Sequence, residues 1–449
     1  MIQLYLNKRD FEYDIYSLVK SFYPGKDVTV TDVADAPEGT DPELKISVFY
    51  EENQITMSVA DRDGALLGQD SAELCQGVER KETKNILKRL AYRILREVTG
   101  QELPWGNLTG IRPTKIPMTL LAQGWKNSDI AKYMRETYYT SREKTALAVM
   151  IANRERHILK DINYENGYSL YVGIPFCPSI CLYCSFSSSP LKLWKDRVDD
   201  YLDALCHEID GAADAFAGKE LNTIYIGGGT PTTLEPAQME RLLSKLEERF
   251  DYSHLKEFTV EAGRPDSITR EKLQVLRSHP VTRISINPQT MNQKTLDLIG
   301  RKHTVEETAE AFRLARDLGF DNINMDLIVG LPGEGKEEVQ HTMEEIRRLD
   351  PDSVTVHSLA LKRAARLNLF REQYQEISFQ NSSEIMDMTA AYCQEAGLYP
   401  YYLYRQKNMA GNFENVGYAK EGKAGIYNIL IMEEKQTIVA CGAGTITKR

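Results

Sequence analysis

Short apolar runs rich in β-branched residues alternate with amphipathic helical segments from residue 169 onward. Helical patterns such as residues 237–250 and 305–320 separate these runs. Strands that alternate with helices of this length are joined by right-handed crossovers and form a parallel sheet. Six consecutive units predict a partial (β/α)6 barrel of α/β class rather than the closed eight-stranded form. The predicted strands are residues 169–174, 223–227, 257–261, 282–287, 322–330 and 353–359.

The pattern predicts three parts. Residues 1–165 combine alternating runs with an amphipathic helix at 84–100 that has a basic face, which indicates an N-terminal α+β accessory domain. Its segment 103–115 is too irregular for helix or strand and is predicted as a loop with a packing or recognition role. Residues 166–361 form the barrel, and residues 362–449 form a small α+β region. This last region stops abruptly after a Gly-rich strand end, so we expect it to be truncated there.

Chemically distinctive residues follow the predicted strands at the point where each strand ends. The carboxyl ends of parallel barrel strands meet at one face, which is where active sites of such barrels lie. We therefore expect these residues to share one site. In strand order they are Cys177, Cys181 and Cys184, then the GGGTPT segment at 227–232, Glu261, Gln289, Asp326 and His357.

The cysteine spacing C-x3-C-x2-C is the strongest chemical signal in the chain. Three thiolates on one short loop can hold three irons of a 4Fe-4S cluster and leave the fourth iron open. The amino and carboxylate groups of S-adenosyl-L-methionine (SAM) can chelate such an open iron in radical chemistry. A structural zinc site is disfavoured, because the next Cys and His, Cys206 and His207, are adjacent and not at ligand spacing. The remaining cysteines are predicted to be buried thiols: Cys75, Cys206, Cys393 and Cys441.

Composition narrows the class of protein. The chain has 449 residues, is 42% hydrophobic and carries a formal net charge of −10, which argues against a broad nucleic-acid surface. No apolar run approaches the ~18 residues that a membrane span needs, and the first residues carry charges where a signal peptide is apolar. With seven cysteines and no secretory signal, a reducing cytoplasm is the predicted compartment and a disulfide framework is disfavoured.

The other strand-end residues are ambiguous when taken singly. The glycines at 227–229 could form only a tight turn, or an edge of backbone that a cofactor can approach closely. Glu261 and Asp326 could be capping or ion-pair residues, or cofactor ligands that are solvated when the site is empty and need no buried partner. Gln289 taken alone favours neither a structural nor a functional role. His357 is more typical of a hydrogen-bonded core histidine than of a catalyst.

Taken together, several segments resemble one family. They are YVGIPFC-x3-C-x2-C at 171–184, GGGTPT at 227–232, Glu261, RISINPQTMN at 283–292, LIGRKHT at 298–304 and NMDLIVGLPGE at 324–334. This set resembles the radical SAM enzymes of the oxygen-independent coproporphyrinogen III dehydrogenase family over about residues 168–361. The long N-terminal region and the YRQKNMAGN segment at 404–412 are most similar to its HemZ-like branch.

The resemblance implies roles for single residues. Cys177, Cys181 and Cys184 are implied to bind the 4Fe-4S cluster, with Tyr171 beside it as a catalytic candidate. The methionine moiety of SAM is implied to meet Gly228, Gly229 and Thr230. Further SAM contacts are implied at Glu261, Gln289, Arg301 and Asp326.

The implied activity is oxidative decarboxylation of two propionates of coproporphyrinogen III to vinyls by a 5′-deoxyadenosyl radical, in heme biosynthesis. The implied partners are a porphyrinogen or heme-like tetrapyrrole and an electron donor of the flavodoxin or ferredoxin type. Two departures keep alternatives open. Phe186 stands where the strict dehydrogenase pattern has a fourth cysteine, and Glu414 stands where the heme-chaperone branch has a histidine. A heme-handling protein that retains a cluster, or a radical SAM enzyme that opens or methylates a porphyrin ring, are the alternatives.

A substrate with four carboxylates needs cations although the chain as a whole is acidic. Arg supplies the bidentate fork that matches a carboxylate. Lys362, Arg363 and Arg366 follow the sixth predicted strand, and Arg405 lies in the YRQKNM segment. We predict these four residues as substrate ligands, with a solvated basic helix face as the alternative.

Overall fold

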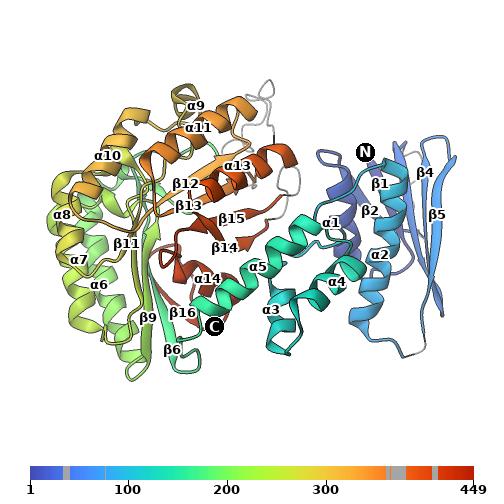
Figure 1. The fold of residues 1–449 in the computed structure, drawn as a ribbon, viewed down its shortest axis with the longest axis horizontal. Helices are drawn as coiled ribbons and strands as arrows, with labels where there is room; N and C mark the ends of the chain where they lie inside the picture. The colour runs from blue at the N-terminus through green and yellow to red at the C-terminus, as the bar shows by residue number, and fades with distance from the viewer. Residues whose placement is uncertain (34–40, 76, 361–364, 366–380, 407–412) are drawn as a thin grey trace. The chain divides into compact units, whose positions relative to one another are not determined.

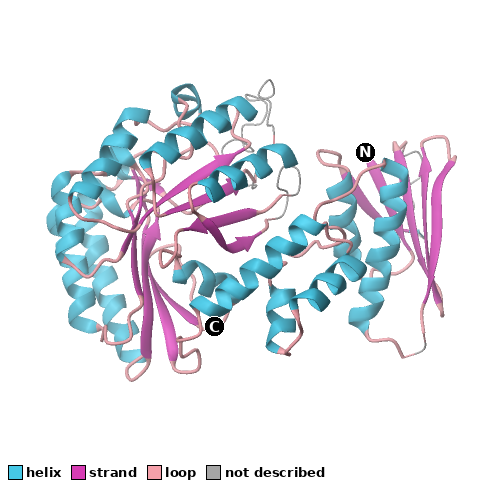
Figure 2. Ribbon diagram, viewed as in Figure 1, coloured by secondary structure: helices cyan, strands magenta, loops and turns pink. Residues whose placement is uncertain are grey.

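The computed structural model describes residues 1–33, 41–75, 77–360, 365, 381–406 and 413–449 (Figures 1 and 2). The chain forms two compact units, Met1–Asn153 and Arg154–Arg449. No helix among these residues combines the length and the apolar character that crossing a membrane requires.

The first unit is a five-stranded sheet with helices packed on one face. The strand order is β2-β1-β3-β4-β5, with β1 parallel to β2 and β3 and the other pairs antiparallel. Alternate strand residues such as Leu4, Val48 and Met57 are buried against Leu18 and Leu90 of the helices. The elements are β1 (Ile2–Leu6), α1 (Glu12–Phe22), β2 (Val28–Asp32), β3 (Leu44–Tyr50), β4 (Gln54–Asp61), β5 (Leu66–Glu73) and α2 (Arg80–Thr99).

Three helices follow in the chain: α3 (Lys115–Ala122), α4 (Asn127–Tyr138) and α5 (Arg142–Ile158). The irregular segment before α3 has a packing role. Trp105 is only 1% exposed, and Gly106 has a φ of 55° at a point where a Cβ would lie 2.0 Å from the Tyr138 carbonyl oxygen. Only glycine fits so close to another backbone at positive φ.

The second unit contains the predicted partial barrel. Six parallel strands run in chain order across a curved sheet, and their connecting helices cover its outer face (Figure 1). The prediction of an open (β/α)6 arrangement is confirmed. The strands are β6 (Gly167–Ile174), β9 (Glu220–Gly228), β10 (Glu257–Glu261), β11 (Arg283–Ser285), β12 (Ile323–Val329) and β13 (Ser353–Ser358). The helices are α6 (Val198–Ala215), α7 (Pro236–Arg249), α8 (Arg270–Ser278), α9 (Gln293–Leu298), α10 (Val305–Asp317) and α11 (Lys336–Leu349).

The residues after β13 extend this same sheet at both edges. β15 (Asn415–Ala419) is antiparallel to β13 and pairs with β14 (Tyr399–Tyr404), whereas β16 (Thr437–Cys441) is parallel to β6 at the opposite edge. Between them lies α14 (Ile426–Glu433), and α13 (Ser383–Glu395) precedes β14. The buried Glu257 carboxylate accepts hydrogen bonds from the first two backbone N–H groups of α14, which fixes the start of this helix to the start of β10.

Candidate cluster and cofactor site

The three cysteines lie on the loop that leaves β6. Cys177 ends the short strand β7 (Phe176–Cys177), which pairs with β8 (Ser189–Pro190) on the far side of the loop. Cys181 is 8% exposed, Cys177 and Cys184 are half-buried, and none of the three forms a disulfide. Burial raises the pKa of the Cys177 and Cys184 thiols. A ligand that stabilises the thiolate form is therefore needed to hold these sulfurs as anions.

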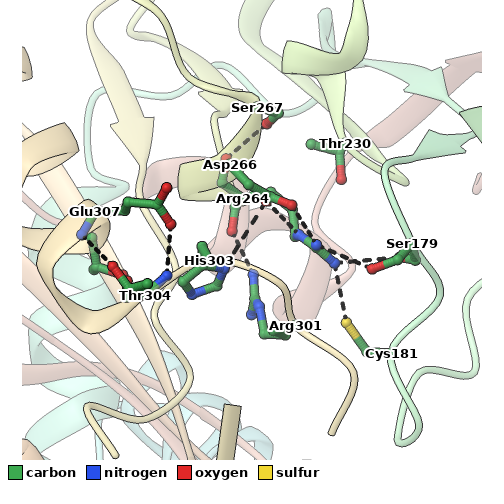
Figure 3. Close-up of polar contacts among 12 residues, drawn as sticks. Ser179, Cys181, Thr230, Arg264, Asp266, Ser267, Arg301, His303, Thr304 and Glu307 are labelled. Carbon is green, nitrogen blue, oxygen red and sulfur yellow. Dashed lines mark hydrogen bonds and ion pairs between the residues drawn. The ribbon is translucent and has the colours of Figure 1, made fainter. Parts of the chain in front are cut away.

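Side-chain hydrogen-bond donors reach the sulfurs of Cys177 and Cys181, and the Phe186 backbone forms a hydrogen bond with Cys184. The Thr230 hydroxyl, in the turn after β9, donates to Cys177 Sγ at 3.5 Å. The Arg264 guanidinium, in the turn after β10, donates to Cys181 Sγ at 3.5 Å (Figure 3). Such donors stabilise thiolates, and hydrogen bonds of this kind to the ligand sulfurs are common around iron–sulfur clusters. The surroundings of the loop thus fit three cluster ligands.

No group of three or more His, Cys, Asp or Glu side chains in the described part of the chain is arranged to hold one metal ion. Ligands of a four-iron cluster each bind a different iron, so their sulfurs do not meet at one point. The open loop geometry is compatible with a cluster.

The glycine turn after β9 packs on the backbone that leads into the cysteine loop. The Gly229 N–H donates to the Ile174 carbonyl at 2.7 Å, and a Cβ at Gly229 would lie 2.5 Å from the Phe176 carbonyl oxygen. Gly228 has a φ of 111°, which side-chain-bearing residues rarely adopt. These glycines are therefore required by the fold, and they also leave backbone without side chains beside the cysteines.

Glu261 and Asp326 have partners, which corrects the expectation that they need none. The Tyr225 hydroxyl donates to Glu261, and Asn324 Nδ2 donates to Asp326 Oδ1 at 2.7 Å. His357 Nε2 lies 3.9 Å from the same Asp326 oxygen. The other ring nitrogen of His357, Nδ1, is hydrogen-bonded to the Tyr404 hydroxyl. Glu261 ends β10 and is bonded to Tyr225 on β9, whereas Asp326 lies in the middle of β12 and contacts Asn324 on its own strand and His357 on β13.

These surroundings separate the two carboxyl pKa values. Burial raises the pKa of Glu261 to about 7, with a further contribution from the charge of Asp326. Burial also raises the pKa of Asp326, but hydrogen bonds and charge from His357, with hydrogen bonds from Asn324 and Thr355, outweigh it and hold the pKa below its ordinary value. At neutral pH Asp326 is ionised and Glu261 is close to its midpoint.

Three tyrosines stack beside Glu261. The Tyr171 and Tyr225 ring centroids are 6.0 Å apart, and those of Tyr225 and Tyr427 are 4.5 Å apart. The rings come from β6, β9 and α14, so the stack joins the C-terminal helix to the barrel wall. Burial, and next the charge of Glu261, raise the pKa of Tyr171, which keeps its phenol protonated.

Gln289 and Arg301 are both held by backbone contacts. Gln289 has a φ of 69°, and its N–H donates to the Asp326 carbonyl at 3.0 Å. Such left-handed backbone in a residue other than glycine stores strain and is typical of functional sites. Arg301 is 3% exposed, donates to the Gly263 carbonyl at 2.9 Å and to the Tyr183 hydroxyl at 3.4 Å, and so links the cysteine loop to the end of β10.

The predicted substrate cations are not assembled in the described residues. Lys362, Arg363 and Arg366 lie outside them. Arg405 is 4% exposed, and burial, opposed by the charge of Glu414, lowers its pKa to about 10. A substrate contact by these four residues stays a prediction. The expectation of buried thiols is right for Cys393 and Cys441. It is wrong for Cys206, which is half-buried, and for Cys75, which is exposed after the edge strand β5.

The structure brings the candidates into two neighbouring sets. The cysteine loop is contacted by Thr230, by the glycine turn and by Arg301, whereas Tyr171, Glu261 and Asp326 lie along the inner side of the strands. Sequence reasoning missed Arg264, Asp266, Tyr225 and Tyr427. Arg264 had a signal, because it follows Glu261 by three positions at the same strand end.

We expect Glu261→Gln to change how stability depends on pH. The folded protein keeps a proton on Glu261 up to about pH 7, whereas the unfolded chain releases it near pH ~4.3. This group's contribution to the free energy of unfolding is therefore complete below pH ~4.3 and is lost as the pH rises through about 7. Melting temperatures of the cluster-free protein should fall more steeply over this range in the wild type than in the variant. Parallel curves would contradict the assignment. Asp326 does not interfere, because its lowered pKa places its effect at more acidic pH.

Comparisons with known proteins identify the family of the chain. The model of the radical SAM superfamily matches residues 171–346. The chain is 42% identical over 372 residues to the oxygen-independent coproporphyrinogen-III oxidase-like protein HemZ of Bacillus subtilis (strain 168), covering 82% of this chain and 74% of that protein. It is 37% identical over 195 residues to the heme chaperone HemW of the same organism, covering 43% of this chain and 51% of HemW.

Among solved structures, the coproporphyrinogen III oxidase HemN from Escherichia coli, described as a radical SAM enzyme, matches with a TM-score of 0.52 and 26% identity. The match covers 63% of this chain and 64% of HemN, and the chain spans about half the length of HemW. The superfamily uses a 4Fe-4S cluster and SAM, which are therefore the cofactors of this chain. The chain belongs to the radical SAM superfamily and, within it, to the HemZ-like group of oxygen-independent coproporphyrinogen-III oxidase-like proteins.

Proposed function

We propose that the protein is an oxygen-independent coproporphyrinogen III dehydrogenase, which converts two propionates of the porphyrinogen to vinyls in heme biosynthesis. The observation that carries this proposal is the cysteine loop. Its sulfurs accept hydrogen bonds from Thr230, which follows β9, and from Arg264, which follows β10 three residues after Glu261. The relatives named coproporphyrinogen III oxidase, or oxidase-like, support the substrate class.

In this proposal Cys177, Cys181 and Cys184 hold the cluster, and Gly228, Gly229 and Thr230 receive the methionine moiety of SAM. The ionised Asp326 and the polar Glu261, Gln289 and Arg301 complete the SAM site. When bound, the two cofactors supply the radical that takes a hydrogen atom from the substrate. Tyr171 borders the same space and keeps its phenol proton because burial raises its pKa.

The proposed reaction determines which groups the protein needs for binding the substrate. Each propionate would give a hydrogen atom to the 5′-deoxyadenosyl radical and one electron to a separate one-electron acceptor, and would release carbon dioxide as the vinyl double bond forms. The remaining carboxylates stay charged and need cations, for which Lys362, Arg363, Arg366 and Arg405 are the candidates. A flavodoxin- or ferredoxin-type protein is the proposed electron donor. We assign residues 166–361 to the radical chemistry, 1–165 to an accessory domain and 362–449 to a region specific to the family.

A second candidate function is heme handling with a retained cluster. The identity to the heme chaperone HemW favours it, as does Phe186, which is 73% exposed at the position of the fourth cysteine in the strict dehydrogenase pattern. Glu414 argues against heme ligation at the chaperone motif, because a carboxylate stands in place of the histidine.

An anaerobic assay with reconstituted protein, a reductant, SAM and coproporphyrinogen III separates these functions. We expect protoporphyrinogen and 5′-deoxyadenosine to form, and neither to form with Cys181→Ala. Formation of 5′-deoxyadenosine with full retention of coproporphyrinogen would exclude the dehydrogenase and leave another radical reaction. Stable heme binding, seen in the absorbance spectrum while neither SAM nor coproporphyrinogen III is consumed, would favour the carrier function.

A further inference from the structure

One buried side chain, Arg264, fastens the cysteine loop to the end of β10. Arg264 is 4% exposed. Its Nη1 donates to the Ser179 carbonyl at 3.3 Å and to Cys181 Sγ at 3.5 Å, and its Nη2 donates to Ser179 Oγ at 3.1 Å (Figure 3). Three of its hydrogen bonds thus reach two residues of the loop, so the guanidinium fixes both the loop backbone and one sulfur.

Asp266 holds the guanidinium in this position. Arg264 Nε and Nη2 donate to the two Asp266 carboxylate oxygens at 2.9 and 2.7 Å. A bidentate pair of this kind fixes the plane of the guanidinium as well as its position. The Ser267 hydroxyl donates to the Arg264 carbonyl at 2.7 Å, which also orders the backbone of this turn. The contacts with Asp266 and Ser267 therefore hold the Arg264 side chain in the conformation that reaches the cysteine loop.

The neighbouring basic groups do not duplicate this contact. Arg301 donates to the Gly263 carbonyl and to Tyr183. His303 is fully buried 4.0 Å from Asp266, and neither of its ring nitrogens has a hydrogen-bond partner among the described residues (Figure 3). Thr230, the donor to Cys177, is uncharged. Among the hydrogen bonds of the described residues, the one from Arg264 to Cys181 is therefore the charge-assisted contact to the loop sulfurs.

A positive donor at a ligand sulfur changes the redox balance of a cluster. Reduction adds negative charge to the cluster and its thiolates, and a nearby cation with an N–H···S bond stabilises that form more than the oxidised one. Hydrogen bonds to the sulfurs are among the factors that set cluster potentials. Loss of the donor is therefore expected to make reduction harder.

We propose that Arg264, held by Asp266, is a positioning residue that orders the cysteine loop and raises the reduction potential of the cluster at Cys181. This inference rests on the proposed cluster ligands. It adds to them a residue that does not touch the irons and that acts only through Cys181 and Ser179.

Three variants of the full chain, reconstituted with iron and sulfide, test the proposal. Arg264→Gln removes the charge, Arg264→Lys retains it without the bidentate fork, and Arg316→Gln is the control. Arg316 forms an ion pair with Asp352 at 2.6 Å in the same unit, and its hydrogen bonds go to the Phe320 and Asp350 carbonyls rather than to the cysteine loop. Midpoint potentials are measured by a redox titration followed by electron paramagnetic resonance. Hydrogen exchange of the Leu182 amide, which donates to the Ile299 carbonyl at 3.0 Å, reports loop order in the cluster-free protein.

We expect Arg264→Gln to lower the equilibrium constant for one-electron reduction about tenfold, a shift of ~59 mV to more negative potential. Arg264→Lys should recover most of this shift, and Arg316→Gln should match the wild type. Leu182 should exchange faster in both Arg264 variants. If Arg264→Gln does not retain iron, faster exchange in the cluster-free protein and recovery of iron by Arg264→Lys still support the proposal.

An unchanged potential and unchanged Leu182 exchange in Arg264→Gln would overturn it. Loss of iron in Arg264→Gln with wild-type exchange of Leu182 would overturn the ordering role. These results are distinct from a failure of the proposed ligands, in which the wild type itself would take up no cluster or would keep it after the cysteines were replaced.

Discussion

Alanine at Cys177, Cys181 or Cys184 is expected to reduce bound iron after reconstitution to background and to abolish SAM cleavage. A site with three protein ligands has no spare thiolate, so each loss leaves an iron without its protein ligand. Arg264 and Thr230 donate to the sulfurs but cannot replace them, because a guanidinium has no lone pair to give to iron and a neutral hydroxyl is a weaker iron ligand than a thiolate. Iron content and the broad visible absorbance of the cluster measure the effect.

Cys75→Ala is the matched control, because this thiol is exposed and belongs to the other unit of the chain. Full iron and activity in any of the three loop variants would mean that another thiol substitutes. Cys441 is the first to test, because it ends β16 opposite Val172 on β6, the strand that leads into the loop. A double variant that also carries Cys441→Ala would then lose the iron that the single variant kept.

The barrel was predictable because the local sequence of each strand has an apolar pattern that identifies it as a strand. β6 and β12 are mostly apolar runs buried on both faces, and the helices after them, α6 and α11, bury apolar residues at helical spacing. The extension of the sheet by β14, β15 and β16 was not predictable in this way. Pairing of β16 with β6 joins residues far apart in the chain, and nothing in its five residues specifies a partner strand.

The site was predictable as far as its residues end strands. Glu261 and Asp326 were found by position, but their partners were not, because Tyr225 lies on a different strand and His357 reads as a core residue. Tyr427 was missed for the same reason as β16: its contact with Tyr225 spans two distant segments. Asp266, two residues from Arg264, is ordinary in sequence and gains its role only from the geometry of a tight turn.

Arg405→Ala is expected to lower the free energy of unfolding by about 3–5 kcal/mol, because it removes a buried charge that interacts with the buried Glu414 and leaves that carboxylate uncompensated. Arg405 is 4% exposed and Glu414 is 2% exposed, and the charge of Glu414 raises the pKa of Arg405 against the effect of burial. We therefore expect Arg405→Ala to reduce the stability of the fold first, rather than to reduce substrate affinity alone. Chemical denaturation of the cluster-free protein measures it.

A double-mutant cycle distinguishes this structural role from substrate binding. If the cost of Arg405→Ala comes from a stranded carboxylate, Glu414→Gln in the same chain should recover much of the lost stability, and the coupling energy should be well above the ~0.5 kcal/mol error of additive sites. Arg405→Lys keeps the charge and should fold with a smaller loss. Should Arg405→Lys instead raise the Michaelis constant for coproporphyrinogen about tenfold at unchanged stability, Arg405 would contact a substrate carboxylate through its fork. Because the two roles move different observables, stability in one case and the Michaelis constant in the other, one set of variants assigns Arg405 to the fold or to the substrate site.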